Sequence, residues 1–156
     1  MYQRILVPID GSATSNRGLD EAIGLARITG ASLRLVHVVD ELTFATGIEP
    51  TAAYAVDMIP LLKQAGTRIV EQGKARVAAQ GVAVDAVLLE SFAARVSDLV
   101  VEQALGWKAD LIVIGTHGRR GVRRMLLGSD AEQILRQAPV PVLLVRAAQA
   151  PGDTPP

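Results

Sequence analysis

The stretch from 110 to 129 constrains the fold more than any other part of the chain. Leu111 to Ile114 is an unbroken apolar run, as expected for a strand that is covered on both faces. The run stops at Gly115, and glycines recur until Ser129, where a helical pattern begins. Ser129 and Glu132 have the spacing of a capping box. We therefore predict an interior strand, a glycine-rich loop and a helix start in succession.

The glycines of this stretch have two interpretations. In the first, backbone N–H groups form a concavity at the positive end of a helix dipole, which suits phosphate. In the second, the glycines serve only as turns and Ser129 only as a cap. The spacing favours the first, because two residues separate Gly115 from Gly118, nine separate Gly118 from Gly128, and Ser129 follows. The chain contains neither the GxxxxGKS/T phosphate loop nor the GxGxxG dinucleotide fingerprint.

This spacing resembles the ATP-binding branch of the universal stress protein family. The resemblance extends to three further blocks, which cover an apolar strand ending in Asp-Gly-Ser, a strand ending in His-Val-Val-Asp, and a proline-flanked run of valine and leucine. These blocks are residues 5–12, 35–40 and 138–145. With the loop they span nearly the whole chain. The resemblance implies a fold of the adenine-nucleotide α-hydrolase type, with five strands in the order 3-2-1-4-5.

Strand-like and helical patterns alternate along the chain. Because each parallel crossover needs a dozen or more residues, this alternation predicts an α/β fold with a single open, twisted, parallel sheet and helices on both faces. We expect strands over 5–9, 33–39, 82–89, 111–114 and 140–145. We expect helices over 12–29, 54–80, 92–105 and 129–137.

Individual residues refine this outline. Pro60 predicts a kink in the second helix or a late start of it. The alternating third strand and the proline-flanked last strand suit the edges of the sheet. His37 is expected to be a hydrogen-bonded core residue, and Trp107 to pack the turn before the fourth strand. Asp10 is expected to cap the helix that follows it or to face a ligand.

Composition limits the classes of function. The 156 residues fit one domain, which we place at residues 1–146, with a disordered tail at 147–156. Sixteen basic and sixteen acidic residues cancel, so no overall charge attracts the protein to nucleic acid or to a membrane, and any such attraction would be local. The chain has no cysteine, which excludes disulfides and thiolate metal sites. No signal peptide pattern and no apolar stretch near the ~20 residues of a membrane span is found, which favours the cytoplasm.

The resemblance implies a set of nucleotide-binding residues. Those around the ribose and adenine are Pro8, Ile9, Asp10 and, through its backbone, Val38. Those that hold the phosphates are Ile114, Gly115, His117, Gly118, Arg119, Gly128, Ser129, Asp130 and Ala131. Ligands in open parallel sheets lie beyond the carboxyl ends of the strands, where the strand order reverses. Both groups of residues should therefore converge on one crevice between the first and fourth strands.

Charged residues surround the expected phosphate position. Asp130 and Ala131 stand where relatives often carry an uncharged residue and a hydroxyl residue. Repulsion of the phosphates by Asp130 would be offset by Mg²⁺ or by arginines. Three interpretations remain open for the basic cluster: phosphate ligands, with Arg119 as the first candidate, a solvated loop face, or a small nucleic-acid patch. The cluster comprises Arg119, Arg120, Arg123 and Arg124.

The sequence favours binding over catalysis. We expect a protein that binds an adenine nucleotide, with ATP ahead of ADP and AMP, in a regulatory or protective role in the stress response. The alternative is a slow ATP hydrolase in which His117 orients or deprotonates water. No second titratable group has a spacing that would hold His117 as a general base, and no paired carboxylates suggest a catalytic metal. A phosphorelay receiver domain lacks support because Asp10 stands alone after the first strand. A flavodoxin-like carrier would need more aromatic residues.

The last predicted strand also suggests a partner. Residues 140–145 are apolar and begin with prolines on either side of Val140, so they suit an edge strand. Together with the family resemblance, this strand predicts a homodimer formed by pairing Val140–Val145 with its copy.

Overall fold

A computed structural model describes residues 1–41, 52–116 and 127–146. Five strands form one sheet in the order β3-β2-β1-β4-β5, and all neighbouring pairs are parallel. The strands are β1 (Arg4–Pro8), β2 (Ser32–Asp40), β3 (Val84–Ser91), β4 (Leu111–Gly115) and β5 (Val142–Val145). The helices are α1 (Ala13–Thr29), α3 (Ala52–Ala78), α4 (Val96–Gly106) and α5 (Ser129–Gln137). The predicted fold class and strand order are confirmed.

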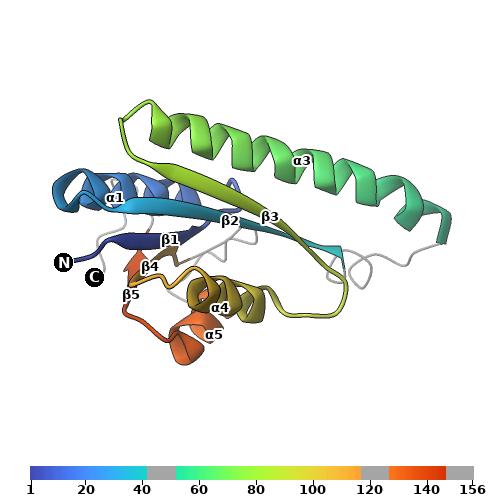
Figure 1. Cartoon of the computed structure of the whole chain (residues 1–156). Helices are drawn as coiled ribbons and strands as arrows, with labels where there is room; N and C mark the ends of the chain where they lie inside the picture. Colours follow the sequence, from blue (N-terminus) through green and yellow to red (C-terminus); the bar gives the residue numbers. More distant parts are fainter. Residues whose placement is uncertain (42–51, 117–126, 147–156) are drawn as a thin grey trace, which may run out of the picture.

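The helices cover both faces of the sheet. α1 and α3 lie on one face, and α4 and α5 lie side by side on the other (Figure 1). Each face has its own apolar core, because strand side chains alternate between the two faces. Ile5 and Val7 pack under α1 and α3, whereas Leu6 packs with Ile112 and Ile134 under α4 and α5. Alternate residues of a strand therefore place their side chains on opposite faces of the sheet.

The central strands are covered on both faces. Ile112 and Val113 of β4 have no exposed surface, which confirms the interior strand that the apolar run predicts. β3 and β5 occupy the two edges, also as predicted. His37 is buried, and its Nδ1 lies 2.7 Å from the carbonyl oxygen of Ile9. The expectation of a hydrogen-bonded core histidine is thus confirmed.

Several predicted boundaries differ from the structure. α3 begins at Ala52 and runs through Pro60, so the predicted late start near Pro60 is wrong. The middle of α3 packs closely on the sheet, since a Cβ at Gly66 would lie 2.9 Å from His37 and from Leu88. α4 begins at Val96 rather than 92. β5 begins at Val142 rather than Val140, because a proline at 141 cannot donate to the ladder.

Trp107 follows α4 and packs against the core under α4 and α5, as predicted. The guanidinium carbon of Arg34 lies 4.8 Å from the centroid of its ring. Asp85 accepts two hydrogen bonds from the same guanidinium, at 2.9 and 2.7 Å. No helix within the described ranges is long and apolar enough to cross a bilayer. The predicted tail at 147–156 lies outside the described residues, as does the predicted loop at 42–51.

Candidate functional site

The strand order reverses between β1 and β4. Chain connections leave these two strands in opposite directions, and ligands of open parallel sheets bind beyond the carboxyl ends of the strands at such a point, here called the crevice. α1 begins directly after β1, and α5 is the next helix after β4. The crevice is therefore bordered by the first turns of two helices.

Three predicted site residues share one face of the sheet at the strand ends, and this surface is called the floor below. Pro8 pairs in register with Val36, two residues before Val38 in β2. Pro8 also lies two residues beyond the Leu6↔Ile112 pair, which puts it level with Ile114. Because residues two apart share a face, the side chains of Pro8, Val38 and Ile114 all lie on the α4 and α5 side.

Ile9 does not share this floor. Its side chain is 6% exposed and belongs to the core under α1 and α3. Its N–H donates to the carbonyl of Val36 at 2.8 Å, and its own carbonyl oxygen contacts His37 Nδ1. Ile9 thus fixes the end of β1 in place, directly before Asp10.

The turn from β1 into α1 is closed by its own hydrogen bonds. The N–H of Ser12 donates to Asp10 Oδ1 at 2.8 Å. The N–H of Ser15 donates to Ser12 Oγ at 3.2 Å, and the N–H of Asp10 donates to Ser15 Oγ at 3.1 Å. Gly11 has φ of 79°, a left-handed conformation that glycine adopts at little cost. The cap of α1 is therefore Ser12 rather than Asp10, and the amides of Asp10, Ser12 and Ser15 all donate within this turn.

Gly115 ends β4 in tight contact with α1. A Cβ at Gly115 would lie 2.7 Å from the carbonyl oxygen of Thr14 and 3.0 Å from the nitrogen of Ser15. Gly18, in the next turn of α1, would place a Cβ 3.2 Å from the nitrogen of Gly115. The two glycines let the helix and the strand end approach closely. Gly115 was predicted to admit phosphate, and the structure gives it a packing role as well.

The loop after β4 is closed at its base. The N–H of Gly128 donates to the carbonyl oxygen of Thr116 at 2.7 Å, and the N–H of Thr116 donates to Val145 at 2.9 Å. These bonds hold Thr116 and Gly128 next to each other at the end of β4. Thr116 is 6% exposed. The amide of Gly128 is thereby committed to the scaffold.

α5 begins at Gly128, which is its N-cap, with φ of −58° and ψ of 147°. The carbonyl of Gly128 accepts from the N–H of Glu132 at 2.9 Å. No side chain among the described residues caps this helix. The predicted capping box is therefore wrong, because Ser129 is already the first helical residue. Its side chain is exposed, whereas Ala131 is buried in the core.

The structure brings most of the predicted site residues together. Pro8, Val38 and Ile114 line the floor, Asp10 and Gly115 end the two central strands, and Gly128 to Ala131 form the start of α5. His117, Gly118 and Arg119, with the other three arginines of the basic cluster, lie outside the described residues. Thr116 and Gly18 were missed. A glycine inside a helix was the available signal for Gly18, because such a position often marks a close approach.

A lysine and a glutamate form an ion pair near the carboxyl end of β3. Lys63 of α3 lies 2.9 Å from Glu90 at the end of β3, and this hydrogen bond raises the pKa of Lys63 above its ordinary value. Lys63 is thus engaged by a carboxylate on the α3 side of the sheet. Within the described part of the chain, no group of three metal-ligating side chains is assembled.

Comparison with known proteins agrees with this architecture. The chain matches the model of the universal stress protein family over residues 1–146. It belongs to the universal stress protein family. A universal stress protein of Methanocaldococcus jannaschii is 35% identical over 146 residues, which cover 94% of this chain and 83% of the relative.

Solved universal stress proteins share the fold. One from Burkholderia pseudomallei is 34% identical, covers 94% of this chain and 97% of its own, and superposes with a TM-score of 0.72. Another was solved in complex with cAMP; it is 26% identical over 94% of this chain and 98% of its own, with a TM-score of 0.65. At least one related protein of this fold therefore binds an adenine nucleotide.

Proposed function

We propose that this universal stress protein binds an adenine nucleotide in the crevice between β1 and β4, with ATP as the first candidate. The observation that carries the proposal is that no described side chain caps the start of α5, at the point where the strand order reverses. The first turn of a helix has N–H groups that the helix itself does not use. At α5 these groups face the crevice at the positive end of the helix dipole, which favours a phosphate.

The floor suits the rest of the nucleotide. Pro8, Val38 and Ile114 offer an apolar surface of the kind that lines small-molecule sites. Because β2 and β4 lie on opposite sides of β1, a ligand with its phosphates at α5 would extend its base over β1 towards Val38. The cAMP complex of a related protein supports an adenine nucleotide as the class of ligand.

Acidic residues at the start of α5 shape the choice of nucleotide. Asp130 and Glu132 lie in its first turn, where they interact favourably with the helix dipole but unfavourably with phosphates. Mg²⁺ bound with the nucleotide would offset this repulsion, and the Asp130 carboxylate is a suitable oxygen ligand. Mg²⁺ should therefore strengthen binding of ATP more than binding of AMP.

The first test is mass spectrometry of small molecules released from freshly purified protein. Calorimetric titration with ATP, ADP, AMP and cAMP follows. Gly128→Val should weaken binding by at least roughly tenfold, because its side chain would stand at the entrance to the first turn of α5. The extended backbone of Gly128 accepts a valine, so circular dichroism should be unchanged.

Gly24→Val is the matched control. Gly24 lies on the exposed side of α1 with no atom within 4 Å of an added Cβ, so its replacement should leave binding unchanged. Absence of any released nucleotide, together with no heat of binding up to millimolar ligand, would refute the proposal.

We propose that binding of the nucleotide, rather than its hydrolysis, is the signal. The protein would serve a regulatory or protective role in the stress response through its bound state, and ligand binding would also stabilise the fold. A turnover near the ~10 per second typical of enzymes would favour the hydrolase instead.

We further propose that the protein forms a homodimer in the cytoplasm through β5. This strand is at the edge of the sheet, and Leu143 on it is 38% exposed. Light scattering at micromolar concentration should give twice the mass of the chain. Replacement of the exposed Leu143 by a charged residue should give monomers, because its side chain is outside the core against which Val142 and Leu144 pack.

A further inference from the structure

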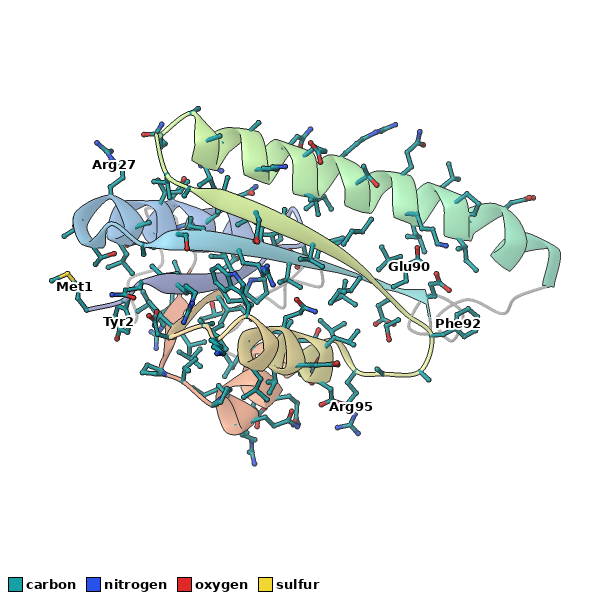
Figure 2. The ribbon with its side chains drawn as sticks, in the orientation of Figure 1. Met1, Tyr2, Arg27, Glu90, Phe92 and Arg95 are labelled. Atoms are coloured by element: carbon teal, nitrogen blue, oxygen red, sulfur yellow. The ribbon has the colours of Figure 1, made fainter. Side chains whose placement is uncertain are left out.

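β2 extends beyond the end of β1. The register between the two strands ends at Pro8↔Val36, whereas β2 continues beside β3 to Asp40 (Figure 1). In Figure 2, Glu90, whose Cα partner is Val39, marks the part of β3 that accompanies β2 past this point. The last residues of β2 therefore have a neighbouring strand on one side only.

The hydrogen-bond pattern of β2 determines which of its backbone groups face β1. The carbonyl oxygen of Val36 accepts from the N–H of Ile9 at 2.8 Å, so Val36 faces β1. The N–H of Leu33 donates to the carbonyl oxygen of Ala83 at 2.9 Å, so Leu33 faces β3. Residues of a strand between two parallel neighbours bond alternately to one and to the other. The N–H and C=O of Val38 therefore point into the space beyond the end of β1, which is the crevice.

A side-chain bond replaces the next bond of the ladder. If the pairing continued, the Ile9 carbonyl would accept from the N–H of Val38, and Ile9 would be the partner of His37. The register does not contain this pair. The Ile9 carbonyl oxygen lies instead 2.7 Å from His37 Nδ1, and Nδ1 is the donor because a carbonyl oxygen only accepts. His37 thus occupies the acceptor that the Val38 amide would use.

Packing holds the His37 ring in this position. The side chain is 7% exposed, and a Cβ added to Gly66 of α3 would lie 2.9 Å from its Cδ2. Its ring therefore lies on the α3 side of the sheet, whereas the side chain of Val38 lies on the floor. His37 can affect a ligand on the floor only through the backbone, that is, through Ile9 and Val38.

We propose that His37 is a positioning residue for recognition of the base. By holding the Ile9 carbonyl, it leaves the N–H and C=O of Val38 for the bound nucleotide. This inference rests on the proposed function and adds the residue that sets base selectivity. Adenine has an acceptor, N1, beside a donor, the 6-amino group, and the N–H and C=O of one residue match that pair. Hypoxanthine has a donor at N1 and an oxygen at position 6, which is the reverse pattern.

His37→Leu is the test of base selectivity. Leucine fills much of the space of the imidazole but has no donor, so the Ile9 carbonyl should turn to the N–H of Val38. Calorimetry with AMP and inosine monophosphate should then show the ratio of their affinities fall roughly fivefold to tenfold, as expected for one lost hydrogen bond. A general loss of packing would weaken both nucleotides equally and leave the ratio unchanged.

Hydrogen exchange tests the same arrangement without a ligand. In the wild-type protein, the Val38 amide has no acceptor in the ladder and should exchange rapidly. In His37→Leu, this amide should exchange at least roughly tenfold more slowly, because it now donates to Ile9. Nuclear magnetic resonance of the ligand-free protein measures both rates.

Two variants separate the hydrogen bond from packing. His37→Asn places Nδ2 as many bonds from Cα as Nδ1 of histidine, so it should keep the ratio of affinities within about twofold and keep rapid exchange at Val38. Its smaller side chain should lower Tm. Val39→Ala is the matched control, because Val39 Cγ2 lies 3.1 Å from the same Cβ position at Gly66. It should also lower Tm and leave the ratio unchanged.

The outcomes separate this inference from the proposed function. An unchanged ratio of affinities in His37→Leu, with nucleotide bound by the wild-type protein, would overturn the role of His37 alone. Equal exchange of the Val38 amide in the two proteins would do the same, as would a His37→Asn variant that behaves like His37→Leu. Failure of the wild-type protein to bind any nucleotide would overturn both proposals.

Discussion

The two helix starts that border the crevice differ in how their first turns are satisfied. At α1, Ser12 caps the helix, and Asp10 and Ser15 complete a closed set of hydrogen bonds. At α5, the N-cap is Gly128 and no described side chain caps the turn. The comparison teaches that a helix N-terminus at the correct edge of a sheet is not enough for anion binding. The sequence before the helix decides whether its amides are consumed by the protein or left for a ligand.

Figure 1 shows why the difference matters for function. α1 lies on the face opposite to α4 and α5, and its first turn packs against the end of β4 through Gly115 and Gly18. The close packing of α1 therefore fixes the end of β4. α5 lies on the same face as Pro8, Val38 and Ile114, so its first turn continues the floor on which a ligand would lie.

The largest effect on stability is expected at the contact between α1 and β4. Gly115→Ala would place a methyl group 2.7 Å from a backbone oxygen of Thr14, and the backbone must shift to relieve this clash. Overpacking of this kind costs typically 1–3 kcal/mol, about 2–12 °C in Tm. Thermal unfolding followed by circular dichroism measures it.

Gly24→Ala is the control on the same helix. Its Cβ would meet no atom within 4 Å, and replacement of a helical glycine by alanine should stabilise the fold by about 0.5–1 kcal/mol. Equal Tm values for Gly115→Ala and the wild-type protein would show that α1 and β4 are less tightly apposed than described.

A smaller effect on stability is expected at the capped turn. Ser12→Ala removes the side chain that accepts from the N–H of Ser15, and loss of an N-cap costs about 1 kcal/mol. Urea unfolding measures the change. Affinity for nucleotide should stay within about twofold, because this turn is assigned no ligand contact. A large loss of affinity would place the phosphates at α1 and reverse the comparison.

The smallest effect on stability is expected at Ser129→Ala. Ser129 is the first residue of α5 and does not cap it, so the free energy of unfolding should change by less than about 0.5 kcal/mol. Affinity for ATP should fall by roughly threefold to tenfold if its hydroxyl contacts a phosphate. A stability loss as large as that of Ser12→Ala, with unchanged affinity, would restore the capping box that the sequence predicted.

Much of the fold follows from local patterns. The apolar run of β4 and the alternation of strands and helices both reflect short-range chemistry that a sequence displays. The strand order came from the family resemblance. The start of α5 was mispredicted because a Ser-x-x-Glu spacing does not distinguish a serine at the N-cap from a serine one residue later. The choice here depends on the bond between Gly128 and Thr116, which joins residues distant in sequence.

The candidate site, too, was predicted where short motifs define it and missed where contacts between distant residues define it. The glycines of the loop and the strand ends at Asp10 and Gly115 were visible as motifs. The contact of Gly115 with Thr14 was not, because it joins residues about a hundred positions apart.

The bond from the Gly128 amide to the Thr116 carbonyl has an evolutionary consequence. It clamps both ends of the intervening segment to the sheet, so substitutions within that segment need not propagate into the core. Ligand preference could then diverge among paralogues by exchange of this one insert, while the surrounding framework is inherited intact.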